Sequence, residues 1–477
     1  MLGLYSCRHH QVTGRGYIGS RPHGGNMMCI VWVWLVIMGL ALPAVLWAQA
    51  LPFGVSLPPS LNFATSPSPV GSGARAAGKA FAFIGVADDA TAASHNPGGL
   101  VQLERLEVSI VGSYLWRRDT QDVTRPETMV ENQAFDSFNL NYLSAVYPFQ
   151  LWQRNIVVSL NVQRLFDLQG DTDVASRFVT VEGIQRVSSQ QTGTLYSLSP
   201  AVAVQLTPNL SVGAAFNIWS DFLLDDGWEQ KVAVQGEGRV VSGNRIVPFV
   251  SSGRIKEEYT FDGFNVTVGF LWRMTPVFSL GGVFRSPFTA DITHRHTSSL
   301  TVTLLDEPSP RSVTTGVSFR ESLEMDLPMS YGLGFSARLS DRWTLSLDVS
   351  RIHWSQLRLE ETQRDDVLLV ENGAPSGKGR AVLHGEADDT TSVRLGAEYL
   401  WIRPSMVIPF RAGAFYDPEP GAGSPDPFFG FSLGTGVGIK QVLFDLAYEF
   451  RAGTIKSEAT DTSVRQHRIL ASVIYHF

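Results

Sequence analysis

Three short patterns in the sequence contain residue types that could do chemistry. Adjacent Asp88 and Asp89 could hold a cation or act as an acid pair, and capping of a local turn by these short carboxylates is the alternative. His294 and His296 stand two residues apart, on one face of a strand, where they could bind a metal ion. No carboxylate or third histidine is near them in the sequence, so we interpret them as exposed loop histidines. We expect no metal site and no cofactor.

The third pattern, Gly434 to Lys440 (GTGVGIK), imitates a phosphate-binding loop. It lies within a strand-like alternation and opens no helix, which argues against nucleotide binding. Its glycines share one face with Ser432. A glycine-lined inner wall could make room for a plug or a ligand, or simply belong to a crowded sheet, and the sequence leaves both open. No Ser/His/Asp arrangement stands out, so we do not expect an enzyme.

The elements that carry these residues follow a period of two. From Arg105 onward, Val108, Ile110 and Tyr114 alternate with Ser109 and Ser113, which predicts a strand with one apolar and one polar face. About fourteen such strands predict an all-β transmembrane antiparallel barrel with a polar lumen. The strands are expected near 105–116, 138–146, 156–163, 193–206, 210–222, 258–273, 277–296, 312–339, 343–358, 389–402, 406–416, 428–439, 441–452 and 464–477.

Short and long connections alternate between these strands, as tight periplasmic turns and long extracellular loops do in outer-membrane barrels. Short turns are expected at 151–155 and 207–209, and long loops at 167–191 and 223–257. Tryptophan and other aromatic residues gather at both strand ends, which is typical of the two interfacial girdles.

The apolar run Ile30 to Ala48 is followed by Ala48-Gln49-Ala50, so residues 1–50 are interpreted as a secretory signal segment, and a misassigned start is an open alternative. A membrane anchor is the alternative. Both cysteines, Cys7 and Cys29, lie in this segment. Without its three arginines the chain has 35 Lys+Arg against 45 Asp+Glu, a net charge of −10. This acidic balance argues against a nucleic-acid partner.

Residues 51–104 are expected to form an extended segment and a plug inside the barrel, with the barrel itself at 105–477. The segment Gly73 to Leu100 is rich in small residues and contains ADDA at 87–90 and NPGG at 96–99. These motifs resemble the FadL and toluene-porin family of outer-membrane transporters. Weaker likenesses to the same family lie at 278–289, 327–357 and 392–416. Gly98 departs from the family pattern, which usually has alanine there.

The resemblance implies passive uptake of hydrophobic compounds, either long-chain fatty acids or aromatic hydrocarbons, across the bacterial outer membrane through a plugged barrel with a lateral exit. It assigns the gate to Asn96, Pro97 and Gly98, and it places Asp88 and Asp89 in the plug. A plausible capture site for apolar ligands begins the 223–257 loop, although these residues could equally be a strand end in the girdle. Its members are Trp219, Phe222, Leu223, Leu224 and Trp228.

A second family is also similar. The PorV-like barrels, which bind or anchor proteins in a secretion system, open with a comparable segment, and Phe431 to Phe450 fits them as well. The last strand alternates and ends in Tyr475 and Phe477, which resembles the assembly signal read by the barrel assembly machinery. We expect outer-membrane lipid and lipopolysaccharide as further partners, and a monomer.

Overall fold

The computed structural model describes residues 71–477 of the 477-residue chain, with gaps at 124–127, 131–132, 178–182, 243–244, 307, 365–367, 370–381, 385–386, 422 and 457–459. The expected signal segment at 1–50 and the first part of the extended segment lie outside the described residues. Within them, no helix is long and apolar enough to cross a bilayer.

Most of the described chain is β-strand. The strands are β1 (Glu107–Val123), β2 (Thr128–Val130), β3 (Gln133–Leu151), β4 (Arg154–Asp167), β5 (Gly170–Arg177), β6 (Gly183–Thr207), β7 (Leu210–Trp219), β8 (Gly227–Ser242), β9 (Arg245–Arg273), β10 (Phe278–Arg285), β11 (Phe288–Leu304), β12 (Arg311–Leu327), β13 (Ser330–Arg338), β14 (Trp343–Ile352), β15 (Arg358–Arg364), β16 (Leu368–Leu369), β17 (Val382–His384), β18 (Thr390–Ile402), β19 (Val407–Tyr416), β20 (Phe428–Ile439), β21 (Val442–Lys456) and β22 (Thr460–His476). The helical turns are α2 (Ala74–Ala77), α3 (Ala92–His95), η1 (Pro97–Gln102), α4 (Asp221–Leu224) and η2 (Trp354–Gln356).

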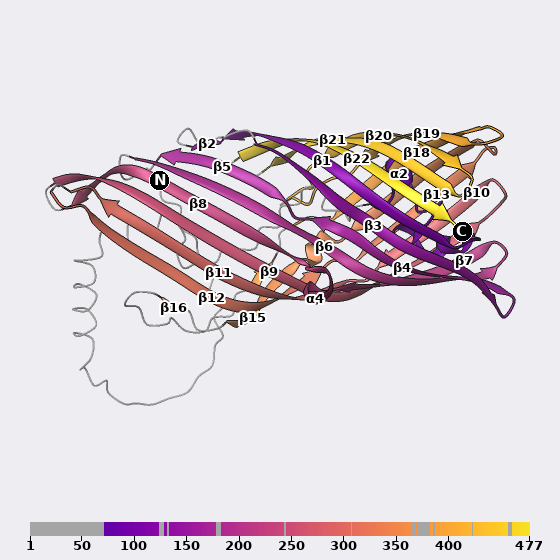
Figure 1. Cartoon of the computed structure of the whole chain (residues 1–477), viewed down its shortest axis with the longest axis horizontal. Helices are drawn as coiled ribbons and strands as arrows, with labels where there is room; N and C mark the ends of the chain where they lie inside the picture. The colour runs from indigo at the N-terminus through magenta and orange to yellow at the C-terminus, as the bar shows by residue number, and fades with distance from the viewer. Residues whose placement is uncertain are drawn as a thin grey trace, which may run out of the picture. The chain divides into compact units, whose positions relative to one another are not determined.

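These strands form one closed antiparallel barrel. Neighbours in the chain pair with one another, and the first strand β1 also pairs with the last, β22, from Glu107 opposite His476 to Val123 opposite Thr460. Several wall strands contain a short break, as between β10 and β11, which both pair with β9. Counting such interrupted strands once gives fourteen, which confirms the expected fold. Figure 1 shows β1, β22 and β21 lying side by side where the barrel closes.

Side chains alternate between the two faces of the wall, as the period of two predicts. In β22, Ile469, Val473 and Tyr475 are exposed on the outer face, whereas Leu470 and Ile474 are buried inside. Exposed apolar side chains are stable there only against lipid, so they mark the outer face as the membrane face.

Several strands continue well beyond the membrane band, where the sequence predicted loops. The expected loop at 167–191 was wrong, because it contains β5 and the first part of β6. The expected loop at 223–257 is instead the short helix α4 followed by the long hairpin of β8 and β9. β9 has 29 residues, whereas a tilted strand needs only about 9–11 to span a bilayer. Lys231, Gln235 and Glu237 are exposed on β8, so this part of the wall faces a polar medium. The prediction failed because such a strand lacks the apolar outer face by which we recognised the others.

His294 and His296 lie on β11 in this extension, and both are buried, so the expectation of exposed loop histidines was wrong. Glu257 of β9 lies between them, 2.7 Å from Nε2 of His294 and 2.8 Å from Nδ1 of His296. Nδ1 of His294 is also 2.7 Å from Glu321 of β12. The acids that were missing from the neighbouring sequence come from adjacent strands.

The N-terminal segment from residue 71 to Leu103 lies inside the barrel. Its helix α2 contacts β20, β21 and β22, and its turn η1 contacts β6, β7 and β9. Most of its residues are buried, and with inward side chains of the wall they form one apolar core. A segment that contacts strands from both halves of the wall fills the lumen.

Candidate functional site

One side of the lumen holds the plug through buried charges. The guanidinium of Arg75 donates hydrogen bonds of 3.1 and 3.0 Å to both carboxylate oxygens of Glu398 on β18, and one of 2.7 Å to Asp88 in the plug itself. Arg411 on β19 donates to Glu398 at 2.6 Å and to Asp445 on β21 at 2.6 Å. This cluster ties the plug to three wall strands.

Wall side chains also hold the plug backbone. Asp348 on β14 accepts the N–H groups of Phe83 at 2.7 Å and Ile84 at 2.8 Å. The sequence left open whether the glycines near 434–438 make room for a plug or a ligand, or only belong to a crowded sheet. At Gly434 the structure decides this, because a Cβ there would lie 2.8 Å from Cα of Gly78 in the plug. The hydroxyl oxygen of the neighbouring Ser432 accepts a hydrogen bond of 2.8 Å from the Ala80 backbone N–H. Gly434 therefore makes room for the plug.

The plug contains a lysine that solvent does not reach. Lys79 is fully buried, and its Nζ has no hydrogen-bond partner among the residues that the structure describes, but it lies 4.5 Å from the centre of the Phe83 ring. Burial lowers the pKa of the Lys79 amine to about 8. The face of the Phe83 ring and the negative charge of Glu398 both stabilise the charged form of this amine.

The paired acids act within the plug. Asp89 Oδ1 accepts the backbone N–H of Thr91 at 2.8 Å and its hydroxyl at 2.6 Å, which is the local capping that the sequence suggested. Asp88 instead forms the ion pair with Arg75. Across the described residues, no group of three histidine, cysteine or acidic side chains is placed to hold a metal ion.

Asn96, Pro97 and Gly98 lie where the plug meets β7 and β9. The Asn96 amide donates to the carbonyl of Ile84 at 2.9 Å and to that of Phe270 on β9 at 2.8 Å, and its oxygen accepts the N–H of Gly98. The Ser211 hydroxyl on β7 donates to the Gly98 carbonyl at 2.7 Å. A Cβ on Gly98 would come within 2.8 Å of the Phe270 Cα, so the close approach requires glycine.

An aromatic cavity lies beside this contact, between α3 of the plug and the wall. Its cavity volume is about 60 Å³, and part of the space is open to solvent. Trp219 stacks between Phe166 and Phe288, with ring centres 6.1 and 5.8 Å away. Its indole N–H donates to Asn265 at 3.1 Å. Leu165, Leu327, Ile352 and Trp354 complete the apolar lining.

The structure does not bring the five expected capture residues together. Trp219 lines the cavity, while Trp228 is buried on β8 and stacks on Tyr259 at 4.6 Å. Phe222 and Leu223 project from α4 and are 92% and 55% exposed, and Leu224 is half-buried beside them. The rest of the lining was missed because it comes from several strands that are distant in the sequence. The sequence did contain a signal for one of these lining residues. Because side chains alternate along a strand and Phe284 points outward, the charged Arg285 next to it points inward.

The barrel wall is irregular where this aromatic cavity borders β4. The β3–β4 ladder ends at Tyr142 opposite Gln163. β4 then has a register shift between Arg164 and Phe166 and is interrupted before β5. The hydroxyl of Tyr196, on β6, donates to the carbonyl of Leu140 on β3 at 3.0 Å, and so reaches across β4. A side chain replaces ladder hydrogen bonds at this point.

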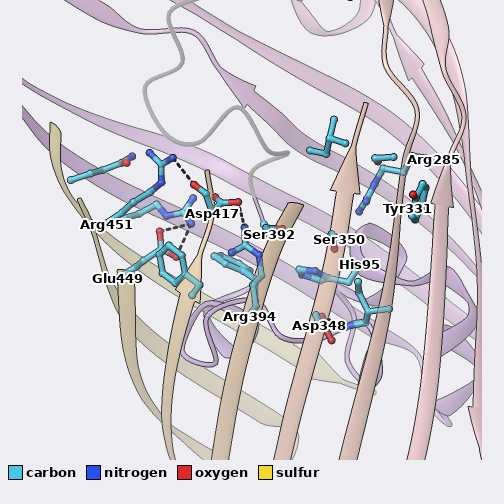
Figure 2. Close-up of a pocket in the computed structure, with 18 residues that line it drawn as sticks. His95, Arg285, Tyr331, Asp348, Ser350, Ser392, Arg394, Asp417, Glu449 and Arg451 are labelled. Atoms are coloured by element: carbon cyan, nitrogen blue, oxygen red, sulfur yellow. Dashed lines mark hydrogen bonds and ion pairs between the residues drawn. The ribbon is translucent and has the colours of Figure 1, made fainter. Parts of the chain in front are cut away.

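A second, polar cavity borders the plug at His95 (Figure 2) and is lined by four arginines from four wall strands. Three of them have carboxylate partners: Arg394 with Asp417 at 2.9 Å, Arg451 with Glu419 at 2.8 Å, and Arg468 with Glu449 at 2.9 Å. The fourth is Arg285.

His95 of the plug also lines the polar cavity, and its Nε2 lies 2.8 Å from the carbonyl of Ser72. Burial lowers the pKa of the His95 imidazole to about 4, so the ring is neutral at neutral pH and donates from Nε2. Phe83 packs edge-on against it at 5.2 Å. The histidine serves the plug as a neutral, hydrogen-bonded core residue.

Comparisons with known proteins agree with this architecture. A Pseudomonas aeruginosa FadL homologue is similar in structure, with a TM-score of 0.57 and 12% identity over 87% of this chain and 100% of its own. The CymD monoaromatic hydrocarbon channel is similar with a TM-score of 0.50 and 15% identity over 88% and 99%. No curated protein matches the chain by sequence.

The family model described as outer membrane protein transport protein (OMPP1/FadL/TodX) matches residues 70–426, from the plug to the loop before β20. This match supports the first of the two resemblances seen in the sequence, and it identifies an outer-membrane transport family. The chain belongs to the OMPP1/FadL/TodX family of outer-membrane transport proteins.

Proposed function

We propose that this barrel takes up hydrophobic compounds, long-chain fatty acids or aromatic hydrocarbons, passively across the outer membrane. The aromatic cavity around Trp219 carries the proposal, because its aromatic and aliphatic side chains beside the plug can cover a hydrophobic molecule after it leaves water. Each apolar side chain covered by a ligand contributes roughly 1.5–3 kcal/mol. The chemistry required is binding and release, with no bond made or broken.

The path we propose has an entrance, a holding site and a lateral exit. Phe222 and Leu223 on α4 are exposed apolar residues that can collect ligand above the cavity. Leu165 and Phe166 line the cavity at the register shift of β4, next to the point where the β3–β4 ladder ends. Ligand would leave sideways there, into the membrane, because few backbone hydrogen bonds must break.

Asn96, Pro97 and Gly98 are proposed as the gate. They hold η1 against β7 and β9, so a shift of η1 would release the plug from the half of the wall that carries the cavity. The opposite half would remain fixed through Arg75 and Glu398. This asymmetry favours a hinge-like movement over expulsion of the whole plug.

The test is uptake by proteoliposomes that contain the purified full chain. Labelled oleate and labelled toluene should enter faster than into protein-free liposomes, and a hydrophilic solute such as glucose should not. Equal rates with and without protein for both apolar probes would refute transport. The same outcome would favour the alternative function, a barrel that binds or anchors proteins of a secretion system.

A further inference from the structure

The end of the barrel that carries the short turns is basic, although the chain as a whole is acidic. Six such turns join β3 to β4, β6 to β7, β9 to β10, β13 to β14, β18 to β19 and β20 to β21, and short turns of outer-membrane barrels face the periplasm. The whole chain has a net charge of −7. The turns and the strand residue on either side of each contain one acid, Asp341, against six exposed basic residues: Arg154, Arg273, Arg338, Arg342, Arg403 and Lys440.

Exposed tryptophans accompany these cations at four of the turns. They are Trp152, Trp272, Trp343 and Trp401, and each lies within two residues of an arginine. The guanidinium of Arg403 is 4.3 Å from the ring centre of Trp401. Across the part of the chain that the structure describes, only Arg338 among the six cations has an acid within ion-pair distance, Asp341 at 3.5 Å. Indole rings prefer the level of the lipid head groups, so these charges lie where anionic head groups can reach them.

One of the six cations lies at the end of an apolar groove on the membrane face. Arg154, the first residue of β4, donates a hydrogen bond to the carbonyl of Leu206 on β6, and Val204, two residues from Leu206, lines the groove. The groove crosses β6, β7, β9, β10 and β13 and has a volume of about 700 Å³, within the roughly 300–1,000 Å³ of ligand pockets. Of its lining residues, only Tyr331 has a polar side chain.

Small residues create this groove. Ala214 on β7 and Gly282 on β10 lie among the larger, exposed side chains of Val202, Phe284 and Leu333. These exposed side chains belong to the outer face of the wall, which is in contact with lipid. A hollow in that face takes a flexible apolar chain, and its basic end selects what the chain is attached to.

We infer that an anionic phospholipid of the periplasmic leaflet binds here, with its phosphate on Arg154 and one acyl chain in the outer groove. The inference is independent of the proposed function, because the site lies on the outside of the wall. Charge complementarity defines the head group, since phosphatidylglycerol has an uncompensated negative charge, whereas phosphatidylethanolamine carries a cation beside its phosphate. Trp152 is 84% exposed next to Arg154 and lies at the level of that head group.

The experiment offers the two lipids in competition. The purified full chain is placed in nanodiscs with equal amounts of phosphatidylglycerol and phosphatidylethanolamine that have the same acyl chains, and native mass spectrometry counts the lipids that stay bound. The unaltered protein should retain about 5-fold more phosphatidylglycerol, and Arg154→Gln should remove most of that preference. Arg154→Lys, which keeps the charge, should keep most of it. Ala214→Phe fills the groove and should lower the retention of both lipids about 5-fold.

Two matched variants serve as controls. Arg186→Gln removes an exposed arginine from the part of β6 beyond the membrane, and Ala397→Phe adds a ring at an outward position of β18, outside the groove. Both should retain the lipids as the unaltered protein does. Thermal unfolding followed by circular dichroism shows that each variant keeps the barrel.

Several outcomes would overturn the inference. Equal retention of the two lipids by the unaltered protein would show that charge does not select the head group, and an unchanged preference in Arg154→Gln would place the head group elsewhere. Unchanged retention in Ala214→Phe would remove the acyl chain from the groove. A dimer without bound phospholipid would assign the groove to a second copy of the chain.

Discussion

The two halves of the lumen hold the plug in different ways. On the side of β18, β19 and β21, buried ion pairs fix α2 through Arg75, Glu398 and Arg411. On the side of β7, β9 and β10, the plug has hydrogen bonds through Asn96, Ser211 and Arg285 but no ion pair among the described residues, and an aromatic cavity lies beside them. The half with ion pairs is built to stay closed, and the half without them can separate with a smaller loss of free energy.

The reason lies in the strength of the contacts. Breaking a buried ion pair leaves a charge without a partner and costs about 3–5 kcal/mol, whereas a neutral hydrogen bond contributes about 0.5–1.5 kcal/mol. A plug that must move for a ligand therefore needs one firm attachment and one weak one. The comparison teaches that the firm side serves as anchor and the weak side as gate.

The largest effect should follow from breaking the anchor. Glu398→Gln removes the carboxylate shared by Arg75 and Arg411, so residues 74–103 should lose about 3–5 kcal/mol of protection, while the strand ladders remain. Hydrogen exchange measured by mass spectrometry checks this. The control is Glu237→Gln, whose carboxylate is exposed and 3.9 Å from Arg186. Unchanged exchange in the plug would remove the anchor from the comparison.

A smaller effect is expected at the gate. Asn96→Ala removes the hydrogen bonds to the carbonyls of Ile84 and Phe270, so η1 should open more often and oleate uptake should rise about 3- to 10-fold. Asn209→Ala, at an exposed turn, should leave the rate unchanged. If uptake by the Asn96 variant is no faster than that of the unaltered protein, the side without ion pairs is not the gate.

The smallest effect is expected at the lateral exit. Tyr196→Phe removes the hydroxyl that bridges to the Leu140 carbonyl, so release into the membrane should become about 2- to 5-fold faster. Tyr448→Phe removes a comparable hydroxyl, bonded to His467 on another part of the wall, and serves as control. Equal rates in the two variants would place the exit elsewhere.

The sequence predicted the wall better than its contents. Alternation such as that of Val108, Ser109 and Ile110 is a local property, so it identified the strands without any knowledge of their neighbours. It failed for β5, β8 and the outer ends of β6, β9 and β11, because strands that leave the membrane lose the apolar face. His294 and Glu257 are 37 residues apart, and only strand pairing brings them within 2.7 Å.

The candidate site shows the same division. The plug motif indicated Asn96 and Gly98, because small and turn-forming residues occupy consecutive positions there. It could not show that Phe270 is the partner of Asn96, or that Phe166, Trp219 and Phe288 stack, because these residues come from four separate wall strands. For the same reason the sequence could not show that Trp219 lines the aromatic cavity whereas Trp228 is buried against Tyr259 on β9.

The sequence by itself determined the barrel, its closing number of strands and the presence of a small-residue plug, because periodicity, turn spacing and side-chain size act over a few residues. Only the tertiary structure decided which half of the lumen holds the plug by ion pairs and which is aromatic. Those features depend on the shear and register of distant strands, which determine the inward side chains that meet across the lumen.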